Sequence, residues 1–185
     1  MIKILGIAGS LRLKSFNSAL LRAAVQLQPE GVRIEIGSIR DIPLYNGDVE
    51  LNEGIPPAVA ALKEKIAQAD GLLLVTPEYN NSMPGVMKNA VDWLTRPATD
   101  IPKVFGNRPV AVIGASPGGF GTILSQQAWL PVLRTLRTRP FFGGRLMVSR
   151  AGGVFDDSGA LIDPKIQAQL LEFLKGFSQF ITTSG

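Results

Sequence analysis

The sequence contains no cysteine and no histidine, and these two absences remove most side-chain chemistry from consideration. Without cysteine there is no disulfide framework, thiol nucleophile or thiolate metal site. Without histidine the chain lacks the usual proton shuttle and the commonest metal ligand, which excludes Ser-His-Asp hydrolysis and most zinc sites. We therefore expect no catalytic side chain and no metal site, and an enzyme of this composition would depend on a bound cofactor.

The chain also lacks any apolar run near the ~20 residues that a membrane helix requires. Its 185 residues are 45% apolar and 18% charged, which is an ordinary composition for a globular protein. The length suits one compact domain over residues 1–185. Residues 1–5 run straight into a strand pattern, which leaves no room for a signal peptide before it. These observations predict a cytoplasmic protein with no membrane partner.

The formal net charge of +4 favours an anionic ligand, either a phosphorylated cofactor or nucleic acid. The basic residues are scattered along the chain, apart from Arg134, Arg137 and Arg139. We interpret these three as a solvated helix end, where positive charge suits the helix dipole. A nucleic-acid patch and a contact to the extra phosphate of NADPH are the alternatives, and we expect no nucleic-acid partner.

Strand and helix patterns alternate along the whole sequence. Strand patterns fall at 3–8, 32–36, 71–76, 109–114 and 145–148, and helical patterns at 16–28, 57–69, 85–94, 122–138 and 164–180. The stretch 37–57 is expected to be a long surface connection, and Pro131 to kink or split its helix. Five such units without repeats predict one doubly wound α/β domain with a parallel sheet. Its ligand is expected beyond the carboxyl ends of the strands, at the loops after strands 1, 3 and 4.

The loop after the first strand, residues 9–18, is rich in groups that bind a phosphate. It offers hydroxyls at Ser10, Ser15 and Ser18, the amide of Asn17 and the guanidinium of Arg12. The start of the following helix adds backbone N–H groups and a dipole that favours an anion. The simpler alternative is that Ser15 or Asn17 only caps the helix. A cap does not account for all five donors together, so the loop predicts a phosphate site.

The other two loops are less specific when each is taken alone. In residues 76–85, Pro77 stiffens the start of the loop and Tyr79 offers a ring on which a flat heteroaromatic ligand can stack. Asn80, Asn81 and Ser82 are equally typical of a plain turn. In residues 115–122, three glycines allow the backbone to approach a ligand closely, although a flexible connector would have the same composition.

Several segments together resemble the NAD(P)H-dependent FMN reductase family, and most of all its bacterial chromate and quinone reductases. They are GSLR at 9–12, SFN at 15–17, TPEYN at 76–80 and KNAVDWL at 88–94, with DIPLY at 41–45 and the segment 155–163 in support. The resemblance covers nearly the whole chain. It implies a flavodoxin-like three-layer sandwich with a five-stranded parallel sheet in the order 2-1-3-4-5, bound FMN and a homodimer or homotetramer formed through the region 84–93.

The resemblance also assigns the residues of a cofactor site. The phosphate of FMN would be held by Ser10, Arg12, Ser15, Asn17 and Ser18. The isoalloxazine ring would contact Pro77, Glu78, Tyr79 and Asn80 on one side and Ser116, Gly118 and Gly119 on the other. Asn81 stands where relatives often have an aromatic or histidine, and Leu124 where they often have arginine, so the pocket of the second substrate departs from the family pattern.

The sequence thus predicts an FMN-dependent NAD(P)H oxidoreductase that reduces a small-molecule electron acceptor, with NAD(P)H as co-substrate. Quinones, free flavin, azo dyes and chromate are candidate acceptors. The alternative is a flavodoxin-type electron carrier without NAD(P)H turnover of its own, but such carriers are usually acidic and lack an arginine in the phosphate loop. A flavin-binding sensor is a third possibility, which no feature of the sequence supports.

Overall fold

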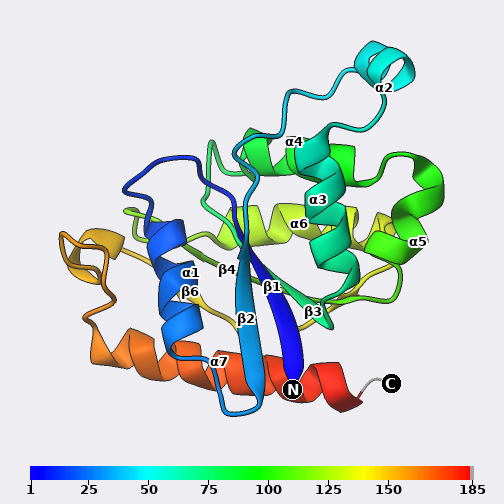
Figure 1. The fold of residues 1–185 in the computed structure, drawn as a ribbon. Coiled ribbons are helices and arrows are strands. Elements are labelled where there is room, and N and C mark those ends of the chain that lie inside the picture. Colours follow the sequence, from blue (N-terminus) through cyan, green and yellow to red (C-terminus); the bar gives the residue numbers. More distant parts are fainter. Residues whose placement is uncertain (184–185) are drawn as a thin grey trace.

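A parallel sheet forms the centre of the computed structural model, which describes residues 1–183 (Figure 1). Its strands are β1 (Ile2–Ala8), β2 (Val32–Gly37), β3 (Gly71–Val75), β4 (Pro109–Ala115), β5 (Arg139–Pro140) and β6 (Met147–Val148). The order is β2-β1-β3-β4-β5, and β6 pairs with β4 beyond β5. The predicted flavodoxin-like α/β fold and strand order are therefore confirmed.

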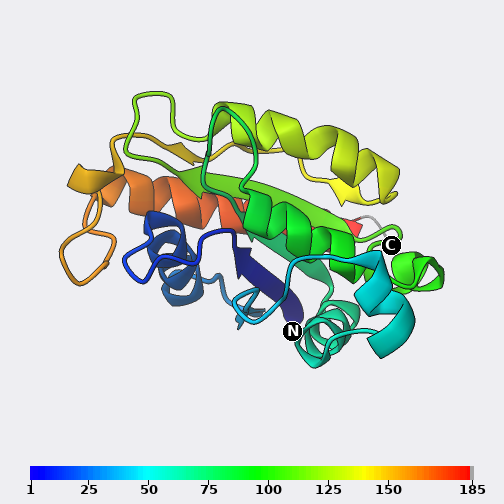
Figure 2. The ribbon, with the colours of Figure 1, turned by 90° about the horizontal axis from the view of Figure 1, so that it is seen from above.

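Helices cover both faces of this sheet (Figures 1 and 2). On one face lie α1 (Phe16–Gln26) and α7 (Pro164–Thr183), and on the other lie α3 (Pro57–Ala67), α4 (Gly85–Leu94) and α6 (Ile123–Thr135). The central strands supply alternate side chains to the two sides: Leu73 and Val75 of β3 face α1 and α7, whereas Leu72 and Leu74 face the other helices. The apolar runs of the sequence thus become strands buried on both faces.

The fifth strand differs from its prediction at 145–148. Two short strands, β5 and β6, take its place, and the chain between them leaves the edge of β4. Phe141 explains part of this departure, because its ring packs against Phe173 and Phe177 of α7 with centroid distances of 5.4 and 5.6 Å. The two glycines that follow, Gly143 and Gly144, are weak strand formers.

Short helices lie in the predicted connection 37–57 and between the helix and strand predicted at 85–94 and 109–114, and the helix predicted to kink or split at Pro131 is not split. The connection 37–57 carries α2 (Gly47–Glu53), and the proline-containing region after α4 carries a 3₁₀ turn (Ala98–Asp100) and α5 (Ile101–Val104). Helix α6 continues past Pro131 without splitting. It ends at Thr135, earlier than predicted, because Arg137 adopts a left-handed backbone with φ 55°. None of the helices within residues 1–183 is both long and apolar enough to span a membrane.

Candidate functional site

The loops after β1, β3 and β4 meet at the carboxyl edge of the sheet, where hydrogen bonds join the first loop to the other two and the second loop to helix α6. Between the first two, the backbone N–H of Gly9 donates to the carbonyl of Val75 at 2.9 Å, and the hydroxyls of Ser10 and Tyr79 lie 3.3 Å apart. A side chain at Gly9 would press on Pro77 and Met87, so the two loops pack closely. The predicted gathering of these loops is therefore present in the structure.

The first loop leads into α1 through a side-chain cap. The hydroxyl of Ser15 accepts from the backbone N–H groups of Asn17 and Ser18, at 3.2 and 3.3 Å. Ser15 is buried, and Ser18 is half-buried in the first turn. The capping role considered from the sequence thus falls to Ser15, and this bond occupies two of the helix's first N–H donors.

Asn17 ties the first loop to the third. Its side-chain amide donates to the carbonyl of Ala115 at 2.8 Å and accepts from the N–H of Ala115 at 2.9 Å. Both residues are buried. Since Ala115 is the last residue of β4, this pair fixes the start of α1 against the strand that leads into the third loop.

The turn before α1 presents unused donors. For the backbone N–H groups of Lys14, Ser15 and Phe16, no protein acceptor is found among residues 1–183. The side chains of Arg12 and Lys14 are exposed on the same turn. Free N–H groups at a helix start together with two cations form a suitable environment for a phosphate.

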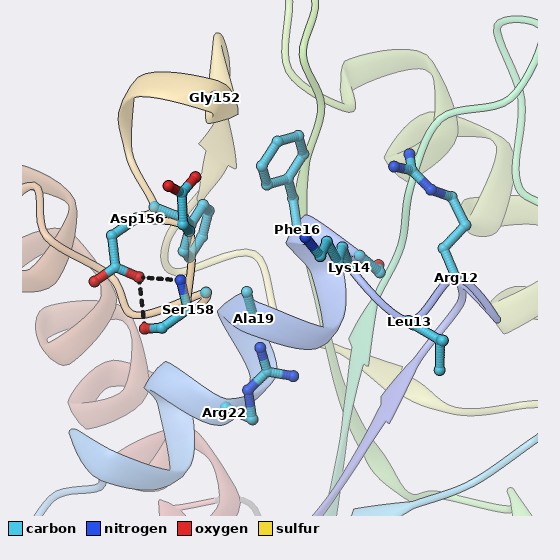
Figure 3. Close-up of a pocket in the computed structure, with 13 residues that line it drawn as sticks. Arg12, Leu13, Lys14, Phe16, Ala19, Arg22, Gly152, Asp156 and Ser158 are labelled. Atoms are coloured by element: carbon cyan, nitrogen blue, oxygen red, sulfur yellow. Dashed lines mark hydrogen bonds between the residues drawn. The ribbon is translucent and has the colours of Figure 1, made fainter.

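A cavity of about 330 Å³ adjoins this turn (Figure 3). It is lined by residues 12–16, Ala19 and Arg22 on one side and by Gly152 and residues 155–159 on the other. The rings of Phe16 and Phe155 stack with centroids 5.8 Å apart and join the two walls. In Figure 3 Arg12 lies on the right and Asp156 and Ser158 on the left, with Phe16 between them.

The acidic wall of the cavity is a tight turn organised by Asp156. One carboxylate oxygen accepts from the N–H and hydroxyl of Ser158, at 2.9 and 2.7 Å, and from the N–H of Ala160 at 2.9 Å. These bonds, the one from the Ser158 hydroxyl foremost, lower the pKa of Asp156. The turn is therefore best formed when Asp156 is ionised.

The second loop is a two-residue hairpin turn. Tyr79 and Ser82 exchange two backbone hydrogen bonds of 3.0 Å, and the residues between them, Asn80 and Asn81, have φ of 51° and 61°. Two positive φ values in succession define a type I′ turn, which asparagine tolerates better than most residues. Tyr79, at 42% exposed, stands at the base of this turn with an accessible ring. The plain-turn interpretation and an aromatic ligand platform are thus both compatible with this loop.

Glu78 binds a helix rather than facing open solvent. Its carboxylate accepts from the backbone N–H groups of Leu124 and Ser125, at 2.9 and 3.1 Å, in the first turn of α6. Behind it, buried Thr76 hydrogen-bonds to the hydroxyl of Ser125 at 2.8 Å and accepts from the indole N–H of Trp129 at 3.1 Å. The second loop is therefore bonded to α6 twice, through Glu78 near the surface and through Thr76 in the interior.

The third loop closes on itself and on the segment after β6. The hydroxyl of Ser116 donates to the carbonyl of Gly121 at 2.6 Å, and the carbonyl of Gly118 accepts from the N–H of Arg150 at 3.0 Å. Gly118 and Gly119 are exposed. At the end of β4, a side chain at Gly114 would collide with the carbonyl oxygen of Thr76 and the hydroxyl of Thr122, so this position requires glycine.

All the residues predicted for the cofactor thus lie on the three joined loops. The predicted phosphate ligands Ser10, Arg12, Ser15, Asn17 and Ser18 surround the start of α1, and the predicted ring contacts Pro77, Glu78, Tyr79, Asn80, Ser116, Gly118 and Gly119 lie on the other two loops. The sequence did not single out the cavity residues Lys14 and Arg22 or the buried network of Thr76, Ser125 and Trp129. The sequence does not show that these hydroxyl and indole groups bond to one another, because their contacts depend on the tertiary fold.

Comparisons with known proteins find similar sequences that match most of the chain. The sequence model of a family described as NADPH-dependent FMN reductase matches residues 2–153. An NAD(P)H-dependent FMN reductase of Pseudomonas aeruginosa is 44% identical over 180 residues, which cover 97% of this chain and 95% of the relative. A quinone reductase of Escherichia coli is 37% identical over 185 residues, covering 97% of this chain and 95% of the relative.

A solved structure shares the whole fold. The flavoenzyme NAD(P)H:acceptor oxidoreductase of Paracoccus denitrificans superposes with a TM-score of 0.89 at 31% sequence identity, and the match covers 100% of both chains. The similarity extends over the sheet, the helices and the three loops at its carboxyl edge.

Proposed function

Because this chain belongs to the NADPH-dependent FMN reductase family, we propose that it is an FMN-dependent NAD(P)H oxidoreductase. The observation that carries the proposal is the gathering of three loops at one edge of the sheet, the first with unused N–H donors and cations and the second with an exposed tyrosine. Such a site suits a flat cofactor with a phosphate at one end. Quinones, flavins, azo compounds and chromate are the proposed electron acceptors.

The phosphate of FMN is proposed to bind at the turn before α1. The N–H groups of Lys14, Ser15 and Phe16 would donate to its oxygens, with the hydroxyls of Ser10 and Ser18 nearby. Arg12 would add a charge-assisted hydrogen bond. One of the two N–H bonds of the Asn17 amide is engaged by Ala115, which leaves the other for the phosphate.

The isoalloxazine ring is proposed to lie between the second and third loops. Pro77, Glu78, Tyr79 and Asn80 would border it on one side, with Tyr79 offering its exposed ring for stacking. Ser116, Gly118 and Gly119 would border the other side, where exposed glycines permit a close approach of the backbone. Hydrogen bonds from the second loop to the first loop and to helix α6 would hold its surface in place before any ligand binds.

The protein's contribution to the reaction is binding and orientation. Bound FMN supplies the redox chemistry, accepting a hydride equivalent from NAD(P)H and passing electrons to the acceptor. The chain has no histidine or cysteine, so no side chain of these types takes part in proton transfer or covalent catalysis. The three loops would hold the nicotinamide and then the acceptor in turn beside the bound cofactor.

Steady-state oxidation of NADPH and NADH with a benzoquinone acceptor distinguishes an NAD(P)H oxidoreductase from a flavodoxin-type electron carrier. The enzyme is expected to consume NAD(P)H in proportion to the quinone reduced, and a carrier would show almost no turnover. A protein that binds FMN but oxidises neither nucleotide would favour the carrier. The basic net charge of +4 and the position of Arg12 in the phosphate loop support the enzyme.

We also propose a cytoplasmic, single-domain subunit that forms a homodimer or homotetramer. The region 84–93, which the family resemblance assigns to dimer formation, contains α4, and Val86 is 36% exposed there. An apolar depression of about 400 Å³ lies between α4 and α6. Analytical ultracentrifugation of the purified protein determines the subunit number.

A further inference from the structure

Glu78 caps helix α6 from a distant part of the chain. Its carboxylate accepts two backbone N–H bonds from residues 46 and 47 positions later in the sequence. Within the described residues, the helix's own N-cap residue, Thr122, makes no side-chain cap, and its first turn contains no acidic residue. The negative charge that a helix start favours is therefore supplied from the loop after β3.

A second set of hydrogen bonds joins the second loop to α6 in the interior of the protein. Thr76, fully buried at the end of β3, bonds to Ser125 and Trp129 of α6. Ser125 thus takes part in both attachments, donating its N–H to Glu78 and sharing its hydroxyl with Thr76. The spacing between the second loop and the start of α6, which follows the third loop, depends on these bonds.

The charge of Glu78 lies at the junction of the two loops proposed to flank the ring. A helix start carries roughly half a positive charge, so the ionised carboxylate more than offsets it and leaves the junction net negative. Reduction adds electrons to a cofactor, and a fixed negative charge nearby disfavours the reduced form. The side chain therefore has the position and the charge to act on the redox equilibrium as well as on the loop spacing.

We propose that Glu78 is a positioning residue that holds the two ring-flanking loops at a fixed spacing and lowers the reduction potential of bound FMN. This inference rests on the proposed function, because it requires that FMN binds between these loops. It assigns to the Glu78 side chain a task other than direct contact with the ring: the carboxylate acts through α6 and through its charge.

Three variants separate the two effects. Glu78→Gln removes the charge but keeps a carbonyl oxygen that can accept both N–H bonds. Glu78→Ala removes the charge and the cap together. Glu53→Gln, on the exposed end of α2, removes the same charge at a remote site and is the matched control.

Three quantities are measured for each protein. They are the FMN dissociation constant, the midpoint potential of bound FMN, and the hydrogen exchange of the first-turn amides of α6 in the apoprotein.

We expect Glu78→Gln to bind FMN within about threefold of the unaltered protein and to favour the reduced cofactor about tenfold more. For a two-electron couple this corresponds to a shift of about +30 mV. Glu78→Ala is expected to shift the potential in the same direction, to bind FMN at least tenfold more weakly and to exchange the amides of Leu124 and Ser125 faster. Glu53→Gln is expected to change none of these.

A Glu78→Gln potential equal to that of Glu53→Gln overturns the proposal, and so does a folded Glu78→Gln protein that no longer binds FMN. If the unaltered protein itself fails to bind FMN, the proposed function is wrong and the potential-lowering role falls with it. Hydrogen exchange of the Leu124 and Ser125 amides in the apoprotein then tests the Glu78 cap on α6 alone. Unchanged exchange in Glu78→Ala would show that this cap does not hold the start of α6.

Discussion

The side-chain amide of Asn17 and the backbone of Ala115 form a reciprocal pair of hydrogen bonds, of 2.8 and 2.9 Å, in the interior of the protein. This pair joins the first turn of α1 to the last residue of β4. The loops proposed to hold the two ends of the cofactor are thereby fixed to each other by one side chain.

Replacement of Asn17 tests this structural role. Asn17→Ala leaves a buried donor and acceptor of Ala115 without partners, which is expected to lower the free energy of unfolding by about 1–3 kcal/mol. Urea unfolding of the apoprotein measures this change. Asn52→Ala, at an exposed position of α2, is the control and is expected to change stability by less than about 0.5 kcal/mol. Equal effects of the two substitutions would contradict the structural role.

Arg12 is expected to contribute to affinity and not to stability. Its side chain is exposed on the turn before α1, and a charge-assisted bond to the phosphate of FMN is worth about 1.5–3 kcal/mol. Arg12→Ala should therefore weaken FMN binding by roughly 10- to 150-fold in a fluorescence titration, with the melting temperature of the apoprotein unchanged. Arg33→Ala, in an exposed ion pair on β2, is the matched control. An unaltered dissociation constant in Arg12→Ala would place its guanidinium away from the phosphate.

The hairpin turn at Asn80 and Asn81 demands left-handed backbone. At Asn81, with φ 61°, glycine fits the conformation without strain, whereas a β-branched residue does not. Asn81→Val is expected to destabilise the protein by about 1–3 kcal/mol, and Asn81→Gly to leave its stability nearly unchanged. Thermal unfolding of both variants measures the difference. Equal melting temperatures would contradict the turn geometry described for this loop.

The turn that forms one wall of the cavity is expected to weaken at low pH. The pKa of Asp156 is lower in the folded protein than in the unfolded chain, where it is about 3.9. Its stabilising effect is therefore fully present above the unfolded value and is lost as the pH falls through the folded value. The melting temperature of the unaltered protein should exceed that of Asp156→Asn at pH 6, and the gap should close as the pH falls below about 4. Asp157→Asn is the neighbouring control, and a gap that persists at low pH would contradict this assignment.

Much of the fold could be predicted because its signals are local. Apolar runs such as Leu72 to Val75 mark strands buried on both faces, and helical stripes between them mark the crossovers. The split fifth strand could not be predicted in this way, because it depends on the packing of Phe141 against α7. Helix α2 was also missed, since it buries no side chain and thus has no apolar stripe.

The sequence nominates residues for the candidate site, but it does not give their contacts. The donors of the first loop are visible in the sequence, whereas the partner of Asn17 lies 98 positions away and that of Glu78 lies 46 positions away. A carboxylate in a loop gives no indication that it will cap a distant helix. Long-range bonds of this kind are set by the tertiary fold, so the predicted ring contact at Glu78 remains a proposal while its cap on α6 is observed.

An anaerobic titration of the purified protein with NADPH and NADH, monitored by absorbance, tests whether the protein is an FMN-dependent NAD(P)H oxidoreductase. We expect a flavin spectrum that corresponds to one FMN per chain once FMN has been added. The nicotinamide nucleotide should bleach this spectrum, and a quinone should restore it. A protein that shows no flavin absorbance and binds no added FMN would contradict this function.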